Sequence, residues 1–178
     1  MGSLRVKLWG TRGLISAPGQ ETAIYGGNTP CVQILHKNNL IIVDTGFGCC
    51  NLGEELMERI VVNREELNIH IIYTHFHWDH IQGLPFFMPI YFANTTLNIY
   101  SPVPKKVTHS NLDILFDGSY SPFDGLMAMP SEIKIKQIKP GLEIDGLKID
   151  FQAVDHGSDV GNLVEHDTYA YRFTDEEN

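Results

Sequence analysis

The sequence is poor in cysteine, and it shows no sign of a leader segment. Three cysteines among 178 residues are too few for a disulfide framework, and Cys49 and Cys50 are neighbours, for which a bridge would be strained. We therefore expect reduced thiols and a cytoplasmic location. The chain opens with residues 1–4 and moves at once into a strand-like pattern, without the basic and apolar segments of a secretory signal.

Basic residues are also scarce. Lys and Arg number 13 against 22 Asp and Glu, which gives a formal net charge of −9. A surface of that charge is poorly suited to binding a phosphate backbone, so a large nucleic acid is disfavoured as the substrate. The longest apolar run, residues 84–93, is too short to cross a bilayer and contains two prolines, so no membrane association is expected.

Length and composition are those of one soluble domain. Hydrophobic residues make up 43% of the chain and charged residues 20%, which is ordinary for a globular protein. No internal repeat and no low-complexity linker divides the sequence. We therefore expect a single domain over residues 1–178 that is large enough to bury a core.

Short segments that alternate apolar and polar residues dominate the chain, and this period is typical of half-buried strands. Strands are predicted at residues 4–9, 69–74, 97–100, 133–138 and 168–173, with hairpins at residues 31–43 and 142–149. Helices are predicted at residues 51–60, capped by Asn51, and 110–116, capped by Ser110. The pattern indicates a mixed α and β protein with mainly antiparallel strands.

Potential metal ligands are concentrated directly after the strand predicted at residues 69–74. His75 and His77 are two residues apart, so in extended backbone both side chains point the same way and can reach one ion. Asp79 and His80 follow where the chain must turn, and they can face a second ion beside the first. Neutral imidazoles and a carboxylate suit Zn, Mn or Fe. A histidine-rich surface loop is the alternative.

The same residues resemble a known family. His75-x-His77-x-Asp79-His80 after a strand resembles the metal-binding signature of the metallo-β-lactamase superfamily. Further similarity, to the branch with tRNase Z and the phosphoribosyl cyclic phosphate phosphodiesterases, lies in residues 9–13, 25–31, 41–48 and 78–87. The resemblance implies an α+β fold, the αββα sandwich of that superfamily, over most of residues 4–174.

The resemblance also implies roles for individual residues. His75, His77 and His156 would bind a first ion, and Asp79 with His80 would begin a second site. Asp79 would in addition orient the attacking water or accept its proton, which makes it the catalytic candidate. Asp44 would support the motif from behind; an aspartate that only closes a turn is the alternative. His166 is a weaker ligand candidate than His156, and His36, His70 and His109 are expected to be ordinary strand or surface residues.

The end of the chain departs from the family pattern. That pattern continues with more of the second sheet, an aspartate that bridges both ions and a final histidine, and Asp167 and Asp175 do not stand in a matching context. We expect a C-terminally short domain with an incomplete second sheet. The family pattern binds two ions, and this chain is expected to bind two or only one. A sheet edge left open in this way favours a homo-oligomer, which light scattering at micromolar concentration would reveal.

Three functions fit these observations. The first is a metal-dependent phosphodiesterase acting on a small cyclic or nucleotide-like phosphodiester. The second is thioester hydrolysis of the glyoxalase II type, and the third is a non-catalytic sensor domain that binds metal or a ligand at an incomplete site. β-Lactam hydrolysis is disfavoured because lactamases of this fold usually lack a histidine directly after the aspartate, where this chain has His80. A flavin-linked di-iron oxidoreductase is disfavoured because those proteins have a glutamate where this chain has His77.

Overall fold

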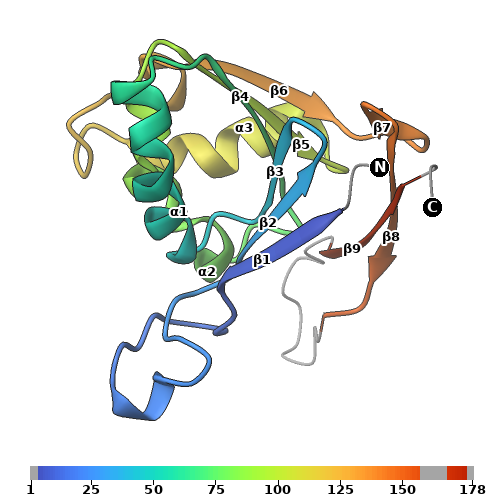
Figure 1. Cartoon of the computed structure of the whole chain (residues 1–178), viewed down its shortest axis with the longest axis horizontal. Coiled ribbons are helices and arrows are strands. Elements are labelled where there is room, and N and C mark those ends of the chain that lie inside the picture. The colour runs from blue at the N-terminus through green and yellow to red at the C-terminus, as the bar shows by residue number, and fades with distance from the viewer. Residues whose placement is uncertain (1–3, 157–167, 176–178) are drawn as a thin grey trace.

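Two β-sheets form the centre of the computed structural model, which describes residues 4–156 and 168–175 (Figure 1). The larger sheet has six strands in sequence order. They are β1 (Arg5–Gly10), β2 (Cys31–His36), β3 (Asn39–Val43), β4 (Leu67–Ile72), β5 (Thr95–Ser101) and β6 (Glu132–Gln137). The smaller sheet consists of β7 (Leu142–Ile144), β8 (Leu147–Val154) and β9 (Thr168–Asp175).

The larger sheet changes direction halfway across. Strands β1, β2 and β3 pair antiparallel, whereas β3, β4, β5 and β6 run parallel. Every residue of β4 except Asn68 is buried, as expected for a parallel strand that is covered on both faces. Because the carboxyl ends of parallel strands meet at one edge of the sheet, Asp44 after β3 and Thr74 after β4 lie side by side. This edge carries the candidate site.

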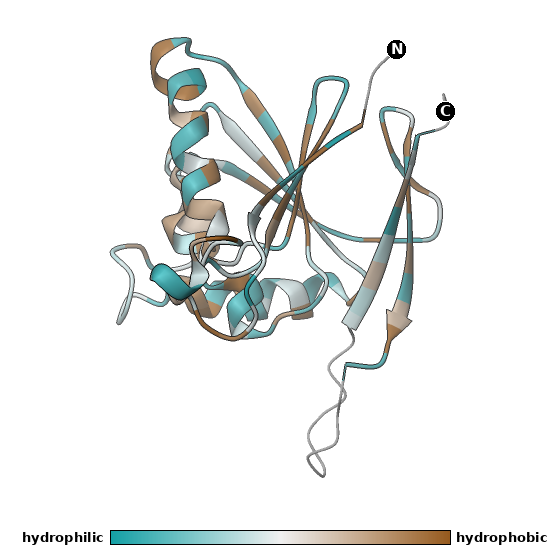
Figure 2. Ribbon diagram, turned by 60° about the horizontal axis from the view of Figure 1, so that its bottom comes forward, coloured by the Kyte–Doolittle hydropathy of each residue, from teal (hydrophilic) through white to brown (hydrophobic). Residues whose placement is uncertain are grey.

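Helices cover one face of the larger sheet, and the smaller sheet lies against the other (Figure 2). The helices are α1 (Gly48–Met57), which continues into a π-helical turn (Glu58–Val62), α2 (Trp78–Ile81) and α3 (Lys105–Asp113). Short 3₁₀ turns occupy residues 20–22, 84–86, 88–91, 114–116 and 126–128. One core cluster lies between the helices and the sheet, and a second lies between the two sheets.

Most predicted elements are present, but both predicted helix caps are wrong. Asn51 lies inside α1, which begins at Gly48, and Ser110 lies inside α3, which begins after Pro104. The predicted Asp145-Gly146 turn is confirmed: both residues have positive φ, and they join β7 to β8. The predicted fold of helices and two sheets is likewise confirmed. His166 and Asp167 fall outside the described residues.

Two further features bear on function. Residues 11–28, which we call the arm, project from the body between β1 and β2 (Figure 1). Over the residues described, none of the helices combines the length and the apolar character that a membrane span requires.

Candidate metal centre

The first two predicted ligands lie three and five residues beyond the end of β4. Tyr73 continues the parallel pairing through its N–H bond to the Tyr100 carbonyl, and the chain then leaves the sheet. His77 has extended backbone (φ −63°, ψ 150°) and stands just before α2. The His75 and His77 rings lie edge to face, with their centroids 4.5 Å apart. The predicted alignment of the two side chains on one side of the segment is therefore present.

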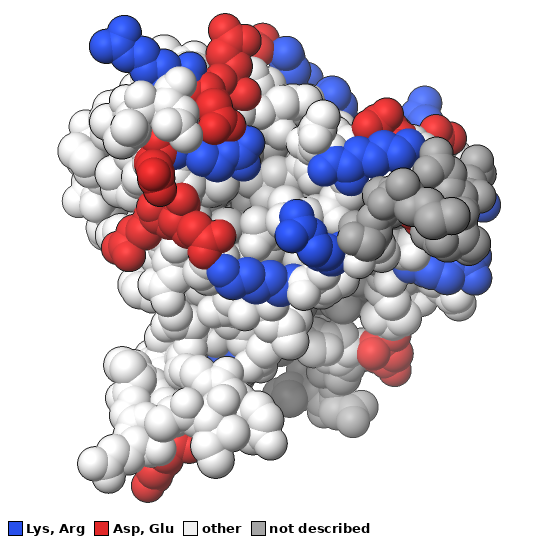
Figure 3. Space-filling model, in the orientation of Figure 1, with Lys and Arg blue, Asp and Glu red and all other residues white. Residues whose placement is uncertain are grey.

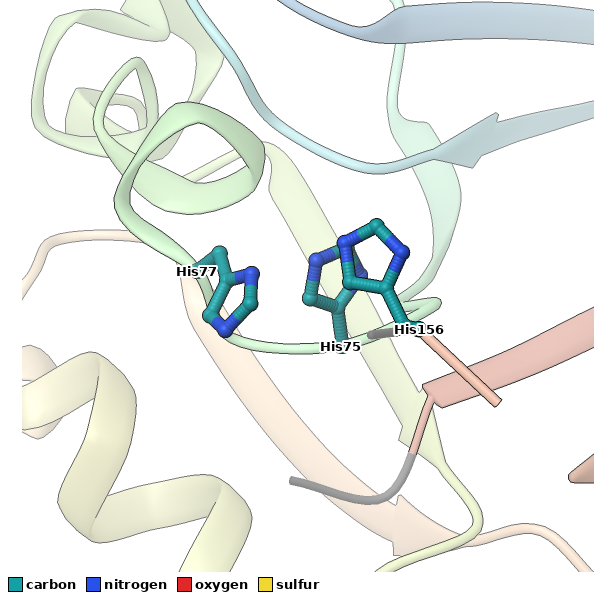
Figure 4. Close-up of side chains that lie close together, drawn as sticks. All are labelled: His75, His77 and His156. Atoms are coloured by element: carbon teal, nitrogen blue, oxygen red, sulfur yellow. The ribbon is translucent and has the colours of Figure 1, made fainter. Parts of the chain in front are cut away.

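The third predicted ligand comes from the other sheet. His156 follows the end of β8, and its ring centroid lies 4.8 Å from that of His75 and 5.4 Å from that of His77. One ring nitrogen from each of the three histidines lies within 4.8 Å of the others, and the rings gather around a common space (Figure 4). Residues 81 positions apart in sequence are thus close enough that they could hold one metal ion together.

Among the described residues, two hydrogen bonds join the smaller sheet to the segment between the end of β4 and His75. The backbone N–H of Tyr169 donates to the Thr74 carbonyl at 3.0 Å, and the Tyr171 hydroxyl donates to the Tyr73 carbonyl at 2.9 Å. Both residues lie on β9, which pairs with β8 along its length. These bonds set the distance between β8 and β4, and so they place His156 against the other two histidines.

The surroundings of His75 show whether this cluster fits a metal ion. Its Nδ1 lies 3.0 Å from the Thr74 hydroxyl, but its Nε2 is buried and has no hydrogen-bond partner among the described residues. A buried polar atom without a partner is unfavourable. Burial, together with neighbouring His80, His77 and His156, lowers the pKa of His75 to about 3, so the ring is neutral and its nitrogen can accept a metal. The donors fit a divalent ion.

Asp79 and His80 lie beside this cluster, on the short helix α2. The His80 ring centroid is 4.1 Å from that of His75, and its Nε2 is 3.6 Å from Asp79 Oδ2. Its Nδ1 lies 2.8 Å from Asp44 Oδ2. Burial opposes protonation of His80, but the hydrogen bond to Asp44 and the charges of Asp44 and Asp79 outweigh it, so the pKa of His80 is raised.

Asp44 holds the motif from behind. Its backbone has φ 60°, a left-handed conformation that aspartate adopts more readily than most residues. Its carboxylate accepts the Thr74 N–H at 2.8 Å and the Thr74 hydroxyl at 2.8 Å, in addition to its contact with His80. Carboxylates that bind the far nitrogen of a ligating histidine fix the orientation of the ring. The supporting position that the resemblance implied for Asp44 is therefore the one observed.

Asp44→Asn is expected to weaken metal binding by about 10–100-fold, the usual effect of removing such a supporting group. The variant keeps the size of the side chain but loses the charge that orients His80. Competition for Zn²⁺ against a chromophoric chelator measures the change. Asp150→Asn, on the exposed side of β8, is the matched control. An affinity equal to that of the control would contradict the role of Asp44.

Glycines allow the motif to pack closely behind the ligands. A Cβ on Gly46 would lie 2.3 Å from the Asp79 carbonyl oxygen and 2.6 Å from the Pro30 carbonyl oxygen. A Cβ on Gly83 would lie 2.3 Å from the Gly46 carbonyl oxygen. Backbone hydrogen bonds join the same segments, from Thr45 to His80 and from Gly83 to Thr45. The turn after β3 and helix α2 therefore form one tightly packed unit.

One contact to the site was not predicted. The backbone N–H of Leu14, in the arm, donates to Asp79 Oδ2 at 2.9 Å. A backbone donor is independent of side-chain identity, so no residue pattern could have indicated it. The other missed residue is Thr74, whose hydroxyl lies between Asp44, His75 and His80. Its place immediately before the first histidine was the only available signal.

The comparisons with known proteins agree with this geometry. A model of the metallo-beta-lactamase superfamily matches residues 24–164. Similar solved structures include a diphosphatase from the PhnP family, with 20% identity and a TM-score of 0.58. Unliganded yeast PDE1 has 20% identity and a TM-score of 0.59, and the short form of human tRNase Z (ELAC1) has 14% identity and a TM-score of 0.57.

The overlap with these structures is unequal. The matches cover 96%, 98% and 96% of this chain but 62%, 62% and 64% of the PhnP-family, yeast and human chains, so the chain spans less than two thirds of their length. No curated protein sequence matches it. The family model nevertheless spans most of the residues that form both the fold and the histidine cluster, and the chain belongs to the metallo-beta-lactamase superfamily.

Proposed function

We propose that this protein is a metal-dependent phosphodiesterase whose substrate is a small cyclic or nucleotide-like phosphodiester. The observation that carries the proposal is the convergence of His75, His77 and His156 beside Asp79 and His80. The net charge of −9 supports a small substrate rather than a large nucleic acid. The names of the similar structures, a diphosphatase, a PDE1 and a tRNase Z, support chemistry at phosphorus.

In this proposal the three histidines bind one divalent ion, and Asp79 with His80 bind a second. Zn²⁺ suits these donors, as do Mn²⁺ and Fe²⁺. When bound, such ions lower the pKa of water towards about 7 and neutralise charge that develops on phosphate oxygens. The chain's own residues supply the geometry: Asp44 orients His80, and the neutral His75 ring keeps its nitrogen available.

Asp79 has the proton-transfer role. Its carboxylate orients the attacking water and accepts a proton from it as the water oxygen forms its bond to phosphorus. The bond from phosphorus to the ester oxygen breaks, and the proton that Asp79 accepted passes to the departing oxygen, so that the alcohol leaves and the carboxylate is restored. Asp79 is suited to this role because its Oδ2 is held by the Leu14 N–H, which fixes the direction of the carboxylate.

The test is hydrolysis of bis(p-nitrophenyl) phosphate with added Mn²⁺ or Zn²⁺. We expect metal-dependent turnover by the wild-type chain and a fall to the chelator-treated background in His77→Ala, which loses one of the three convergent rings. A chain that binds metal but hydrolyses no phosphodiester would refute the proposal. Turnover of a thioester instead, under the same conditions, would assign the chemistry to the glyoxalase II type.

We also propose a cytoplasmic location, on the basis of the cysteines. Cys31, Cys49 and Cys50 are all free thiols, and burial raises the pKa of Cys31 and of Cys49. Buried thiols of this kind need no oxidising compartment.

A further inference from the structure

The arm reaches the metal centre through one backbone group. Leu14 lies 65 positions before Asp79 in the sequence, yet its N–H donates to Asp79 Oδ2 at 2.9 Å. The same oxygen lies 3.6 Å from His80 Nε2. The Asp79 carboxylate therefore stands between a neutral donor on the arm and a ring on its own helix.

Leu14 adopts an unfavourable backbone conformation to make this contact. Its φ is 72°, in the left-handed region that a bulky side chain rarely occupies. Leu14 is 84% exposed, so burial of the residue does not compensate for that conformation. Residues that the surrounding structure holds in sparsely populated backbone conformations cluster at functional sites, where the conformation itself has a use. The use indicated here is the direction of the Leu14 N–H.

The turn around Leu14 is held by local hydrogen bonds. Ile15 N–H donates to the Gly13 carbonyl at 3.1 Å, and Arg12 Nε donates to the Ile15 carbonyl at 2.8 Å. At the base of the arm, Thr11 and Arg12 N–H both donate to the Asn28 carbonyl, at 3.1 and 3.0 Å. The turn is thus fixed with respect to β1 and β2 even though the arm projects from the body.

Few of the residues on the arm are charged, so the contact with Asp79 is not one of many charge interactions made by the arm. In Figure 3 the arm is the projection at the lower left, and it shows few charged side chains. The exposed residues on it include the apolar Leu14, Ile15, Ile24 and Tyr25. The charged group that the Leu14 N–H meets is therefore Asp79, and a hydrogen bond to a charged acceptor is stronger than one between neutral groups.

We propose that the Leu14 peptide N–H is a positioning group for Asp79: it fixes the rotation of the carboxylate, so that the second ion is bound in a defined geometry. The inference rests on the proposed function only in taking Asp79 as a metal ligand. It adds that the arm, through a backbone atom, sets the affinity of the second ion. Supporting groups of this kind change metal affinity by about 10–100-fold when they are removed.

An amide-to-ester replacement removes the donor, and it also weakens the Gly13 carbonyl as the acceptor of the Ile15 N–H. Substituting Leu14 by its α-hydroxy acid converts the Gly13–Leu14 peptide into an ester, which removes the N–H and keeps the side chain. The readout is Co²⁺ binding followed by its d–d absorption, and this readout does not depend on turnover of any substrate. We expect the second equivalent of Co²⁺ to bind about 10–100-fold more weakly, with an altered absorption band, while the first equivalent is unaffected.

The matched control is the same replacement at Ala17, whose N–H donates to the Gly27 carbonyl at 2.9 Å within the arm. It removes one arm hydrogen bond without touching Asp79. Leu14→Gly separates the donor from the side chain: it keeps the N–H, and it should bind the second Co²⁺ at least about ten times more tightly than the Leu14 ester.

Two results would overturn the proposal. One is an equal effect of the Ala17 and Leu14 esters on the second Co²⁺, which would assign the loss to the arm as a whole. The other is equally weak binding by Leu14→Gly and the Leu14 ester, which would assign it to the side chain. A wild-type chain that binds two Co²⁺ ions but hydrolyses no phosphodiester would refute the proposed function and leave this inference testable.

Discussion

His75→Ala is expected to abolish tight metal binding. His75 is central to the cluster: its ring lies within 5 Å, centroid to centroid, of His77, His80 and His156. Its buried Nε2 has no hydrogen-bond partner among the described residues, so this nitrogen is the one that could bind an ion. Groups that only support a ligand contribute about 10–100-fold to metal affinity, so loss of the ligand itself should cost more than about 100-fold. Titration calorimetry with Zn²⁺ measures this change.

The metal-free variant should remain folded, because removing an unpartnered buried nitrogen relieves an unfavourable group. The control for loss of a histidine is His109→Ala, on α3 and outside the cluster. We expect wild-type Zn²⁺ affinity in that control. Equal affinities of the His75 and His109 variants would contradict the assignment of the cluster as a metal centre.

Gly46→Ala is expected to destabilise the fold by about 3 kcal/mol or more, the upper part of the range for overpacked sites. A Cβ at this position would lie 2.3 Å from the Asp79 carbonyl oxygen and 2.6 Å from the Pro30 carbonyl oxygen. Both atoms belong to the backbone, so no rotamer change can relieve the overlap. Relief requires the backbone at Asp79 and the backbone at Pro30 both to move away from the turn after β3, and the first movement would also displace the Asp79 and His80 side chains.

Urea unfolding of the metal-free protein measures the free-energy change. The control is Gly19→Ala, where the backbone is extended (φ 169°) and no atom beyond the two neighbouring residues lies within 4 Å of the added Cβ. That substitution should change the unfolding free energy by less than about 0.5 kcal/mol, as is usual for surface sites. Similar values for the two variants would show that α2 and the β3 turn are not packed as tightly as described.

Local signals predicted the strands and hairpins well. Alternation of apolar and polar residues located β1 and β6, and the Asp145-Gly146 turn located the β7–β8 hairpin, because these signals depend on residues close in sequence. The order of β3 to β6 could not be derived in the same way. Parallel neighbours pair over long sequence separations. Their pairing is decided by how the strands pack against the helices that cover one face of the larger sheet.

Helix starts were predicted less well, for a reason visible in the structure. α1 begins at Gly48, three residues before Asn51, because the turn after β3 is packed against α2 through Gly46 and Gly83. That tertiary packing overrides the local capping preference of Asn51. α3 likewise begins directly after Pro104, which occupies the N-cap position, and this places Ser110 in the interior.

The candidate site also contains residues that local sequence signals predicted and residues that they did not. The local pattern alone placed His75 and His77 together with Asp79 and His80 beside them, and the resemblance added His156. The geometry brings all five into one region. The contacts of the Leu14 N–H and the Thr74 hydroxyl could not be predicted, because a backbone donor and a threonine that bridges ligands have no signature of their own in a single sequence.

Metal content per chain, measured by elemental analysis on protein purified without chelators, tests the account most directly. The account predicts about two ions per chain, one bound by His75, His77 and His156 and one by Asp79 and His80. A value near zero would contradict the metal centre itself. A value near one would contradict the assignment of Asp79 and His80 to a second ion.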